Sequence, residues 1–99
     1  MAHCPPELLE EIAEVRRWPG ILERSQGVFY LHRQPFLHFH LFEGARRRAD
    51  VNGPAGWIHI DLLQPVTATR RRDLLREARR QYRERVGRRA DDGAATARR

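Results

Sequence analysis

The hydrophobic pattern changes period along the chain, and this change constrains the fold more than any other feature of the sequence. Residues 28–32 and 36–42 are rich in aromatic side chains that alternate with others, and residues 57–62 alternate Ile or Leu with polar or aromatic residues. Alternation of this kind is typical of a β-strand that buries one face, whereas a helix buries residues three and four apart. The middle of the chain is therefore predicted to form a β-sheet.

The first two strands are predicted to form a β-hairpin across residues 33–35. A change of register by one residue moves every side chain of a strand to the opposite face. With a three-residue loop, Phe29 shares a face with Leu37 and Phe39, whereas a two-residue loop places His38 on that face instead. We predict the three-residue loop, because it keeps one face apolar.

Three further segments lie around this hairpin. Residues 52–56, Asn-Gly-Pro-Ala-Gly, are predicted as a turn that leads into the strand 57–62. Residues 46–51 are polar and are predicted as a third strand at an edge of the sheet. Residues 21–26 are expected to be a connector or a short extended lead-in to the hairpin.

Helical spacing occurs on both sides of the strands. Leu8, Ile12 and Val15 lie on one helical face, and Pro-Gly at positions 19–20 ends this first helix. Thr69 is predicted as the N-cap of a last helix that runs to about Val86 and is ended by Gly87. The apolar side chains of this helix fall in one stripe: Leu74, Leu75, Ala78, Tyr82 and Val86.

The order helix, strands, helix predicts an α+β fold, in which an antiparallel sheet of three to four strands carries the N- and C-terminal helices on one face. The chain has 99 residues, which is the size of one domain. We predict a flexible N-terminus over residues 1–5 and a single α+β domain over residues 6–87. Residues 88–99 are predicted to be a disordered, arginine-rich tail, because they carry too little apolar surface to become ordered.

Positive charge is the dominant feature of the composition. The chain has 19 arginines, no lysine and 13 acidic residues, so its net charge is +6. Such an excess attracts nucleic acid or an acidic partner. On the predicted last helix, five arginines form a stripe beside the apolar one: Arg72, Arg76, Arg79, Arg80 and Arg83. This stripe is either a nucleic-acid-binding surface or a solvated helix face with internal ion pairs.

The histidines of the predicted strands are the sharpest candidates for chemistry. His38 and His40 point the same way from one strand, and Trp57, His59 and Asp61 share a face of another. If the two strands are neighbours, these side chains converge on the side of the sheet opposite the helices. Imidazoles are suitable ligands for zinc, iron, nickel or copper, so His38, His40 and His59 are also candidate metal ligands. The alternative is a half-exposed sheet face on which the imidazoles bond to neighbours or water.

Other chemistry finds little support in the sequence. Ser25 lacks the Gly-x-Ser-x-Gly pattern and Cys4 has only His3 beside it as a base, so neither is expected to be a nucleophile. No glycine-rich phosphate motif precedes a helix, and no cofactor is expected. The chain has no apolar stretch of membrane-spanning length and no secretory pattern at its N-terminus, so we expect a cytoplasmic protein without a membrane partner.

Several short motifs resemble those of a known family. They are Trp18-Pro19-Gly20-Ile21, Gly27-Val28-Phe29-Tyr30-Leu31, Phe36-Leu37-His38-Phe39-His40 and Gly56-Trp57-Ile58-His59-Ile60, followed by a helix with Leu74-Leu75 and Tyr82. Over residues 8–86 the chain resembles the small bacterial and fungal "luciferase domain" family, whose label implies no established light-emitting chemistry. The positions that match the family's motifs are His38, His40, Gly56 and Trp57. A second similarity, in the order of elements alone, is to the YjbR-like proteins, which are described as having a DNA-binding fold; a shared fold does not fix a function.

Together these observations predict a non-enzymatic binding or accessory protein. Its expected ligand surface is the sheet face that carries His38, His40, Trp57, His59 and Asp61. The alternatives are a nucleic-acid-binding module that uses the arginine stripe and a small metal-dependent enzyme that uses the strand histidines. Because two helices leave one face of the sheet uncovered, a homodimer through that face or through an exposed edge is a further expectation.

Overall fold

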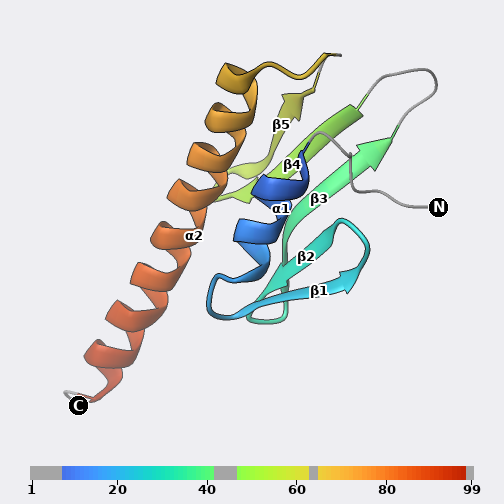
Figure 1. Ribbon diagram of the computed structural model, residues 1–99. Helices are drawn as coiled ribbons and strands as arrows, with labels where there is room; N and C mark the ends of the chain where they lie inside the picture. Colours follow the sequence, from blue (N-terminus) through green and yellow to red (C-terminus); the bar gives the residue numbers. More distant parts are fainter. Residues whose placement is uncertain (1–7, 42–46, 63–64, 98–99) are drawn as a thin grey trace.

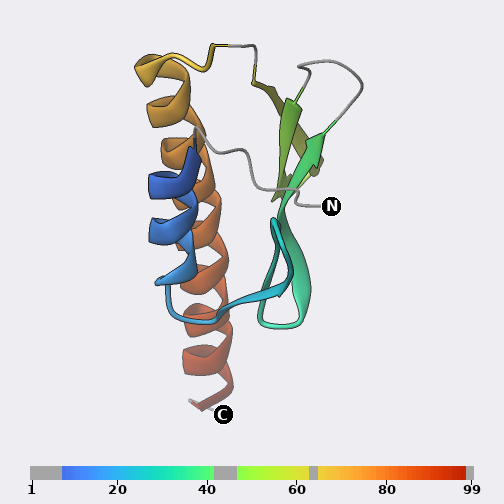
Figure 2. The same ribbon diagram turned by 45° about the vertical axis from the view of Figure 1, so that its right-hand side comes forward.

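The computed structural model describes residues 8–41, 47–62 and 65–97. The elements follow one another as α1 (Leu9–Arg16), β1 (Ile21–Ser25), β2 (Val28–Leu31), β3 (Gln34–Leu41), β4 (Arg47–Gly53), β5 (Gly56–Asp61) and α2 (Ala68–Ala97). The strands form one antiparallel sheet in the order β1-β2-β3-β4-β5, and both helices lie on the same face of it (Figures 1 and 2). The predicted α+β fold is therefore confirmed, with five strands in place of the expected three to four. No helix of the described residues is both long enough and apolar enough to cross a membrane.

The additional strand is β1, over the segment that was expected to be a connector or an extended lead-in. It pairs with β2, and Ile21 lies opposite Leu31 and Leu22 opposite Tyr30. Ile21 packs on the core, while Leu22 is 58% exposed on the other face. Because β1 contributes only one such core residue and exposes a leucine, its alternation is hard to recognise in the sequence.

The β2–β3 connection has two residues, so the predicted three-residue loop is wrong. His32 and Arg33 have φ values of 50° and 72°, which form the tight turn that joins twisted antiparallel strands. The predicted facing of the side chains is nevertheless correct, because β3 contains a bulge. Tyr30 pairs with Pro35 but Phe29 pairs with Leu37, so one extra residue, Phe36, is inserted between them.

The bulge reverses the parity of β3. Its first pairs follow from the two-residue turn, and beyond the bulge Leu37 and Phe39 face the core with Phe29 while His38 faces the opposite side. The Pro35 carbonyl at the bulge accepts hydrogen bonds from Asn52 Nδ2 at 2.8 Å and from Arg85 Nη1 at 3.3 Å. The neighbouring strand and α2 thus both hold the bulge in place.

Strand β4 lies in the interior of the sheet, between β3 and β5, so the prediction of an edge strand is wrong. Its inward residues, Ala49 and Val51, are buried but small, which makes the segment look polar. Its outward residues Arg48 and Asp50 bond to each other, and this pairing allows polar side chains in a central strand.

The core lies between the sheet and the two helices. It is formed by Leu8, Ile12, Val15, Trp18, Phe29, Leu31, Phe36, Leu37, Phe39, Ala49, Val51, Leu62, Leu74 and Ala78. Tyr82 packs against this core beside Trp18. Its hydroxyl donates a 2.6 Å hydrogen bond to the Pro19 carbonyl, and its ring centroid lies 5.0 Å from that of Trp18. The predicted apolar stripes of both helices thus contribute to this core.

Helix α2 differs from its predicted bounds at both ends. Thr67 is its capping residue in place of Thr69, because Thr67 Oγ1 accepts a 3.1 Å hydrogen bond from the backbone N–H of Arg70. At the other end the helix continues through Gly87 to Ala97, so residues 88–97, predicted as part of a disordered tail, belong to it. A single glycine weakens a helix by only about 1 kcal/mol, which does not by itself end one. The predicted flexible residues 1–5 lie outside the described residues.

The same substitution at two glycines should change stability in opposite directions. Gly20 has a φ of +85°, and a Cβ there would lie 2.7 Å from His32 Cε1. Gly20→Ala should therefore lower the free energy of unfolding by about 1–3 kcal/mol. Gly87 is helical with open space around it, so Gly87→Ala should raise that free energy by about 0.5–1 kcal/mol. Urea unfolding followed by circular dichroism measures both, and equal effects of the two substitutions would contradict this account.

Candidate functional site

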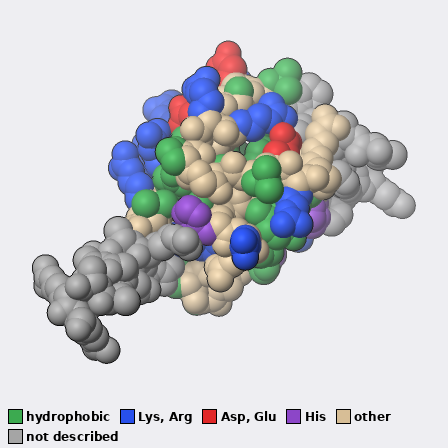
Figure 3. All heavy atoms as spheres, turned by 90° about the horizontal axis from the view of Figure 1, so that it is seen from below, with side chains coloured by type: hydrophobic (Ala, Val, Ile, Leu, Met, Phe, Trp, Pro, Cys, Tyr) green, Lys and Arg blue, Asp and Glu red, His purple; other side chains and the backbone are tan. Residues whose placement is uncertain are grey.

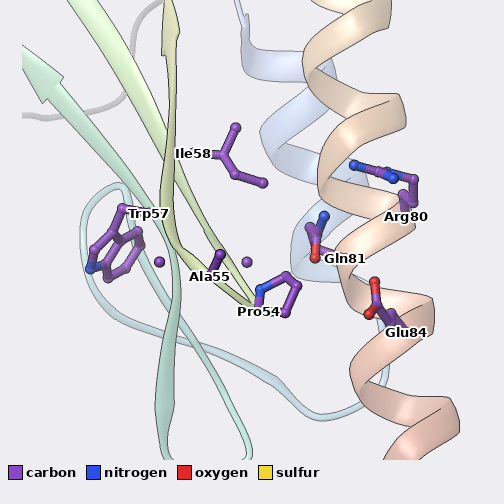
Figure 4. Close-up of a pocket in the computed structure, with 9 residues that line it drawn as sticks. Pro54, Ala55, Trp57, Ile58, Arg80, Gln81 and Glu84 are labelled. Carbon is purple, nitrogen blue, oxygen red and sulfur yellow. The ribbon is translucent and has the colours of Figure 1, made fainter.

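The face of the sheet opposite the helices carries the candidate site. On β5, Ile58 points toward α2 while its neighbour Trp57 points to the other side of the strand (Figure 4). His59 and Asp61 share the side of Trp57, since alternate residues of a strand lie on one face. We call this side the open face, because neither helix covers it (Figure 2).

The register of the strands brings the predicted residues together in two rows across the open face. His38 on β3 pairs with Asp50 on β4, and Asp50 pairs with His59 on β5. In the next row His40 pairs with Arg48, and Arg48 pairs with Asp61. The predicted residues of β3 and β5 are thus separated by β4, whose own side chains lie between them.

Asp50 is the centre of this arrangement. Its Oδ1 accepts hydrogen bonds from His59 Nδ1 at 2.6 Å and from Arg48 Nε at 2.8 Å. Its Oδ2 lies 2.8 Å from His40 Nε2 and 3.2 Å from Arg48 Nη2. Asp50 is only 5% exposed, so one buried carboxylate orients two imidazoles and a guanidinium.

The surroundings of Asp50 determine its protonation. Burial opposes ionisation, but hydrogen bonds from His59 and Arg48 and the charges of Arg48 and His40 outweigh it, and the pKa of Asp50 is lowered from its ordinary value of 3.8. An ionised carboxylate only accepts hydrogen bonds. The imidazole nitrogens that face Asp50 therefore carry hydrogens, and in a neutral His59 the other nitrogen, Nε2, is an acceptor.

A hollow of about 260 Å³ opens beside this network. It is lined by His38, His40, Asp50, Trp57 and His59. The rings of His38 and His40 lie 4.0 Å apart, Trp57 is 42% exposed, and the His59 side chain is 54% exposed. Four of the five predicted ligand-surface residues thus line one hollow, while Asp61 lies on the same face in the adjoining row.

Sequence reasoning missed the two residues of β4 that organise this site. Arg48 and Asp50 lie in the segment that was expected at an edge, where charged residues require no partner. The available signal was the spacing of two from Arg48 to Asp50, which puts opposite charges on one face of a strand. Without the strand order, that spacing does not tell which other side chains they meet.

The three histidines do not form a metal site. Within the described residues, no group of three or more His, Cys, Asp or Glu side chains is arranged to hold a metal ion. The physical reason is that His40 Nε2 and His59 Nδ1 are directed at different oxygens of Asp50 and at no common point. The prediction of His38, His40 and His59 as metal ligands therefore finds no support in this geometry.

The arginine stripe lies on α2, on the other side of the molecule from the open face. A hollow of about 310 Å³ is lined by Arg76, Arg79, Arg80 and Arg83. In a view from below, arginine side chains crowd the edge on which α2 lies in Figure 1 (Figure 3). Four of the five arginines predicted for nucleic-acid binding are thus neighbours, and Arg72 is exposed nearer the start of the helix.

Part of this stripe is paired internally. Arg79 Nη1 lies 3.1 Å from Glu14 Oε2 and its guanidinium lies over the ring of Trp18. Arg80 Nη2 lies 2.9 Å from Glu77 Oε2. Within the part of the chain that the structure describes, Arg76 and Arg83 make no hydrogen bond or ion pair. The stripe therefore combines two anchored cations with two that are available to a ligand.

A third hollow, of about 450 Å³, lies between α2 and the turn that joins β4 to β5 (Figure 4). Arg80, Gln81 and Glu84 line its helix side, and the segment Gly53–Ile58 lines the other. Gln81 is buried there, and its Nε2 donates a 2.9 Å hydrogen bond to Glu77. The polar groups of this hollow thus belong largely to the helix.

Comparison of the chain with protein-family models, with curated proteins and with solved structures gives no match. The similarities to the luciferase-domain family and to the YjbR-like proteins therefore remain predictions.

Substitution of Asp50 should reveal its network through the pH dependence of stability. Because the folded state lowers the pKa of Asp50, its contribution is present above the ordinary value of 3.8 and is lost as the pH falls through the folded value. Asp50→Asn should lower the free energy of unfolding by about 1–3 kcal/mol at pH 7, and the difference from the unsubstituted protein should shrink in strong acid.

Urea unfolding at both pH values measures this effect. Asp61→Asn is the matched control, because it removes the same charge from the same face outside the Asp50 network, and it should change stability little at either pH. If Asp50→Asn lowers the free energy of unfolding by the same amount in strong acid as at pH 7, the carboxylate charge does not stabilise the fold.

Proposed function

We propose that the protein is a small binding protein whose ligand lies on the open face, over the hollow formed by His38, His40, Asp50, Trp57 and His59. The observation that carries the proposal is the buried Asp50 carboxylate, which holds Arg48, His40 and His59 in one arrangement. Burial of a charge costs free energy unless the charge is paired and hydrogen-bonded, and apolar side chains stabilise a sheet equally well. A fully bonded carboxylate under exposed imidazoles is therefore better explained by their orientation than by stability.

The exposed groups above Asp50 support binding. Trp57 and His59 present large flat surfaces to solvent beside a concave site, and exposed aromatic side chains that flank fixed polar groups are typical of ligand sites. Their position on the ordered strand β5 reduces the entropy that a ligand must overcome.

The residues around the hollow favour binding over covalent catalysis. Its lining, as far as the structure describes the chain, contains no serine, threonine, cysteine or lysine side chain, and its one carboxylate, Asp50, is already bonded by Arg48, His40 and His59. Ser25 is at the end of β1, which lies at the opposite edge of the sheet from β5. No metal-holding group within the described residues supports the metal-dependent enzyme. A cytoplasmic location and a homodimer remain predictions.

Binding on the open face should be visible by NMR. In a titration with millimolar single-ring aromatics, aliphatic acids and nucleosides, at least one compound should shift the side-chain signals of Trp57 and His59. The signals of Trp18, which is buried in the core, should stay unchanged. Trp57→Ala should weaken that binding about tenfold, because stacking on an aromatic ring contributes about 1–3 kcal/mol. Shifts from no compound, or an unchanged affinity in Trp57→Ala, would contradict the proposal.

A second candidate function is nucleic-acid binding by the arginine stripe of α2. The helix Ala68–Ala97 contains ten arginines and five acidic residues, so it carries a charge of +5 out of the +6 of the whole chain. The hollow lined by four arginines lies on this helix, and two of them have no partner within the described chain. Concentrated positive charge on one helix face is the electrostatic pattern that phosphate backbones select. An acidic protein partner is the alternative.

Salt dependence tests the second candidate. If the four arginines each contact a phosphate, the affinity for a labelled DNA duplex should fall about 100-fold between 50 and 200 mM salt, because each contact releases about 0.9 counterion. Arg76→Gln with Arg83→Gln removes two contacts, and the same change of salt should then cost only about tenfold. Fluorescence anisotropy measures both.

The matched control is Arg24→Gln with Arg33→Gln, which removes the same charge from β1 and the β2–β3 turn. It should retain the steep salt dependence. Equal effects of the two double variants would mean that net charge alone attracts the duplex, and tighter binding of poly-glutamate or anionic vesicles than of DNA would contradict nucleic-acid binding.

A further inference from the structure

We infer that the ligand of the open face is a planar heteroaromatic ring that donates a hydrogen bond to His59 Nε2, as a nucleobase with an exocyclic amine does. This inference rests on the proposed binding function and specifies the chemical class of the ligand.

One nitrogen of His59 is bonded to Asp50, and the other is available to a ligand. Nδ1 lies 2.6 Å from Asp50 Oδ1, and the ionised carboxylate accepts hydrogen bonds only, so Nδ1 carries the hydrogen. In a neutral imidazole the other nitrogen is then an acceptor. Within the described residues, His59 has no partner other than Asp50. In the neutral ring, Nε2 of the half-exposed His59, which lines the hollow, is therefore the nitrogen that can accept a hydrogen bond from a ligand.

The charged groups at the hollow are paired with each other. The guanidinium of Arg48 makes two hydrogen bonds to Asp50, at 2.8 and 3.2 Å, so these two charges compensate each other. Asp50 in turn is bonded by Arg48, His40 and His59 and has little capacity left for a cation. When the imidazoles are neutral, neither an anion nor a cation finds an uncompensated charge among the lining residues, and a neutral ligand is favoured.

Flat side chains determine the shape of the hollow. The lining consists of three imidazoles, one indole and the Asp50 carboxylate, so flat rings form most of the walls. The volume of about 260 Å³ lies just below the range of about 300–1,000 Å³ that is typical of sites for drug-sized molecules, which favours a smaller ligand. Flat walls stabilise a flat ligand by stacking, as aromatic side chains do with bases. A compound of one or two fused rings with an amine at its edge satisfies all three conditions.

A matched pair of ligands tests this class at pH 8. 9-Methyladenine has hydrogen-bond donors only on its amine, and 9-methylpurine has the same rings without a donor. NMR titration should show 9-methyladenine binding about fivefold more tightly, because one hydrogen bond contributes about 1 kcal/mol. Benzoate, a ring that carries an anion, should bind more weakly than either compound.

Substitution of His59, the proposed hydrogen-bond acceptor, is the second part of the experiment. His59→Phe keeps a flat ring and removes Nε2, so it should abolish the preference for 9-methyladenine over 9-methylpurine. His32→Phe, in the β2–β3 turn away from the hollow, should leave the preference unchanged, and circular dichroism shows whether each variant is folded.

The outcomes separate this inference from the function on which it rests. Equal affinity for the two methylated rings, tighter binding of benzoate, or an unchanged preference in His59→Phe would overturn the ligand class alone. The same holds if another compound of the broader panel binds at Trp57 and 9-methyladenine does not. If no compound of either set shifts Trp57 or His59, the proposed binding function is overturned as well.

Discussion

The bulge at Phe36 is the constraint on which the rest of the structure depends. A two-residue turn alone would place His38 and His40 toward the helices and Leu37 and Phe39 toward solvent. One inserted residue reverses this parity, so Leu37 and Phe39 complete the core while His38 and His40 reach the open face. The bonds from Asn52 and Arg85 to the Pro35 carbonyl hold the reversal in place. Core and candidate site are thus two results of one irregularity in one strand.

Beyond the bulge, the sheet separates two kinds of surface. One side carries a hydrogen-bonded network centred on Asp50, in which positive and negative groups compensate each other. Beyond the helices on the other side lies the outer face of α2, where arginines exceed their acidic partners. Because the core lies between these surfaces, a neutral ligand and a polyanion would meet different parts of the same small molecule.

The sequence predicted much of this arrangement, and the errors have physical reasons. The period of two on β5 and the period of a helix in α2 are strong signals, because each places several large apolar side chains on one face. Strand β1 was missed because it contributes a single core residue, Ile21, and exposes Leu22. The predicted edge position of β4 was wrong, because small inward residues make an interior strand resemble an edge strand. His38, His40, Trp57 and His59 were grouped correctly from alternation, whereas Asp50 could be recognised only once β4 was known to lie between β3 and β5.

The position of β5 at the end of the sheet has a consequence for regulation. Trp57 and His59 form one wall of the hollow, and they lie on the last strand in the order, whose outer edge pairs with no other described strand. A chain that added a strand along this edge would extend the wall and change access to the imidazoles. Strand addition and ligand occupancy would then be thermodynamically linked, so that each alters the affinity of the other by the same factor.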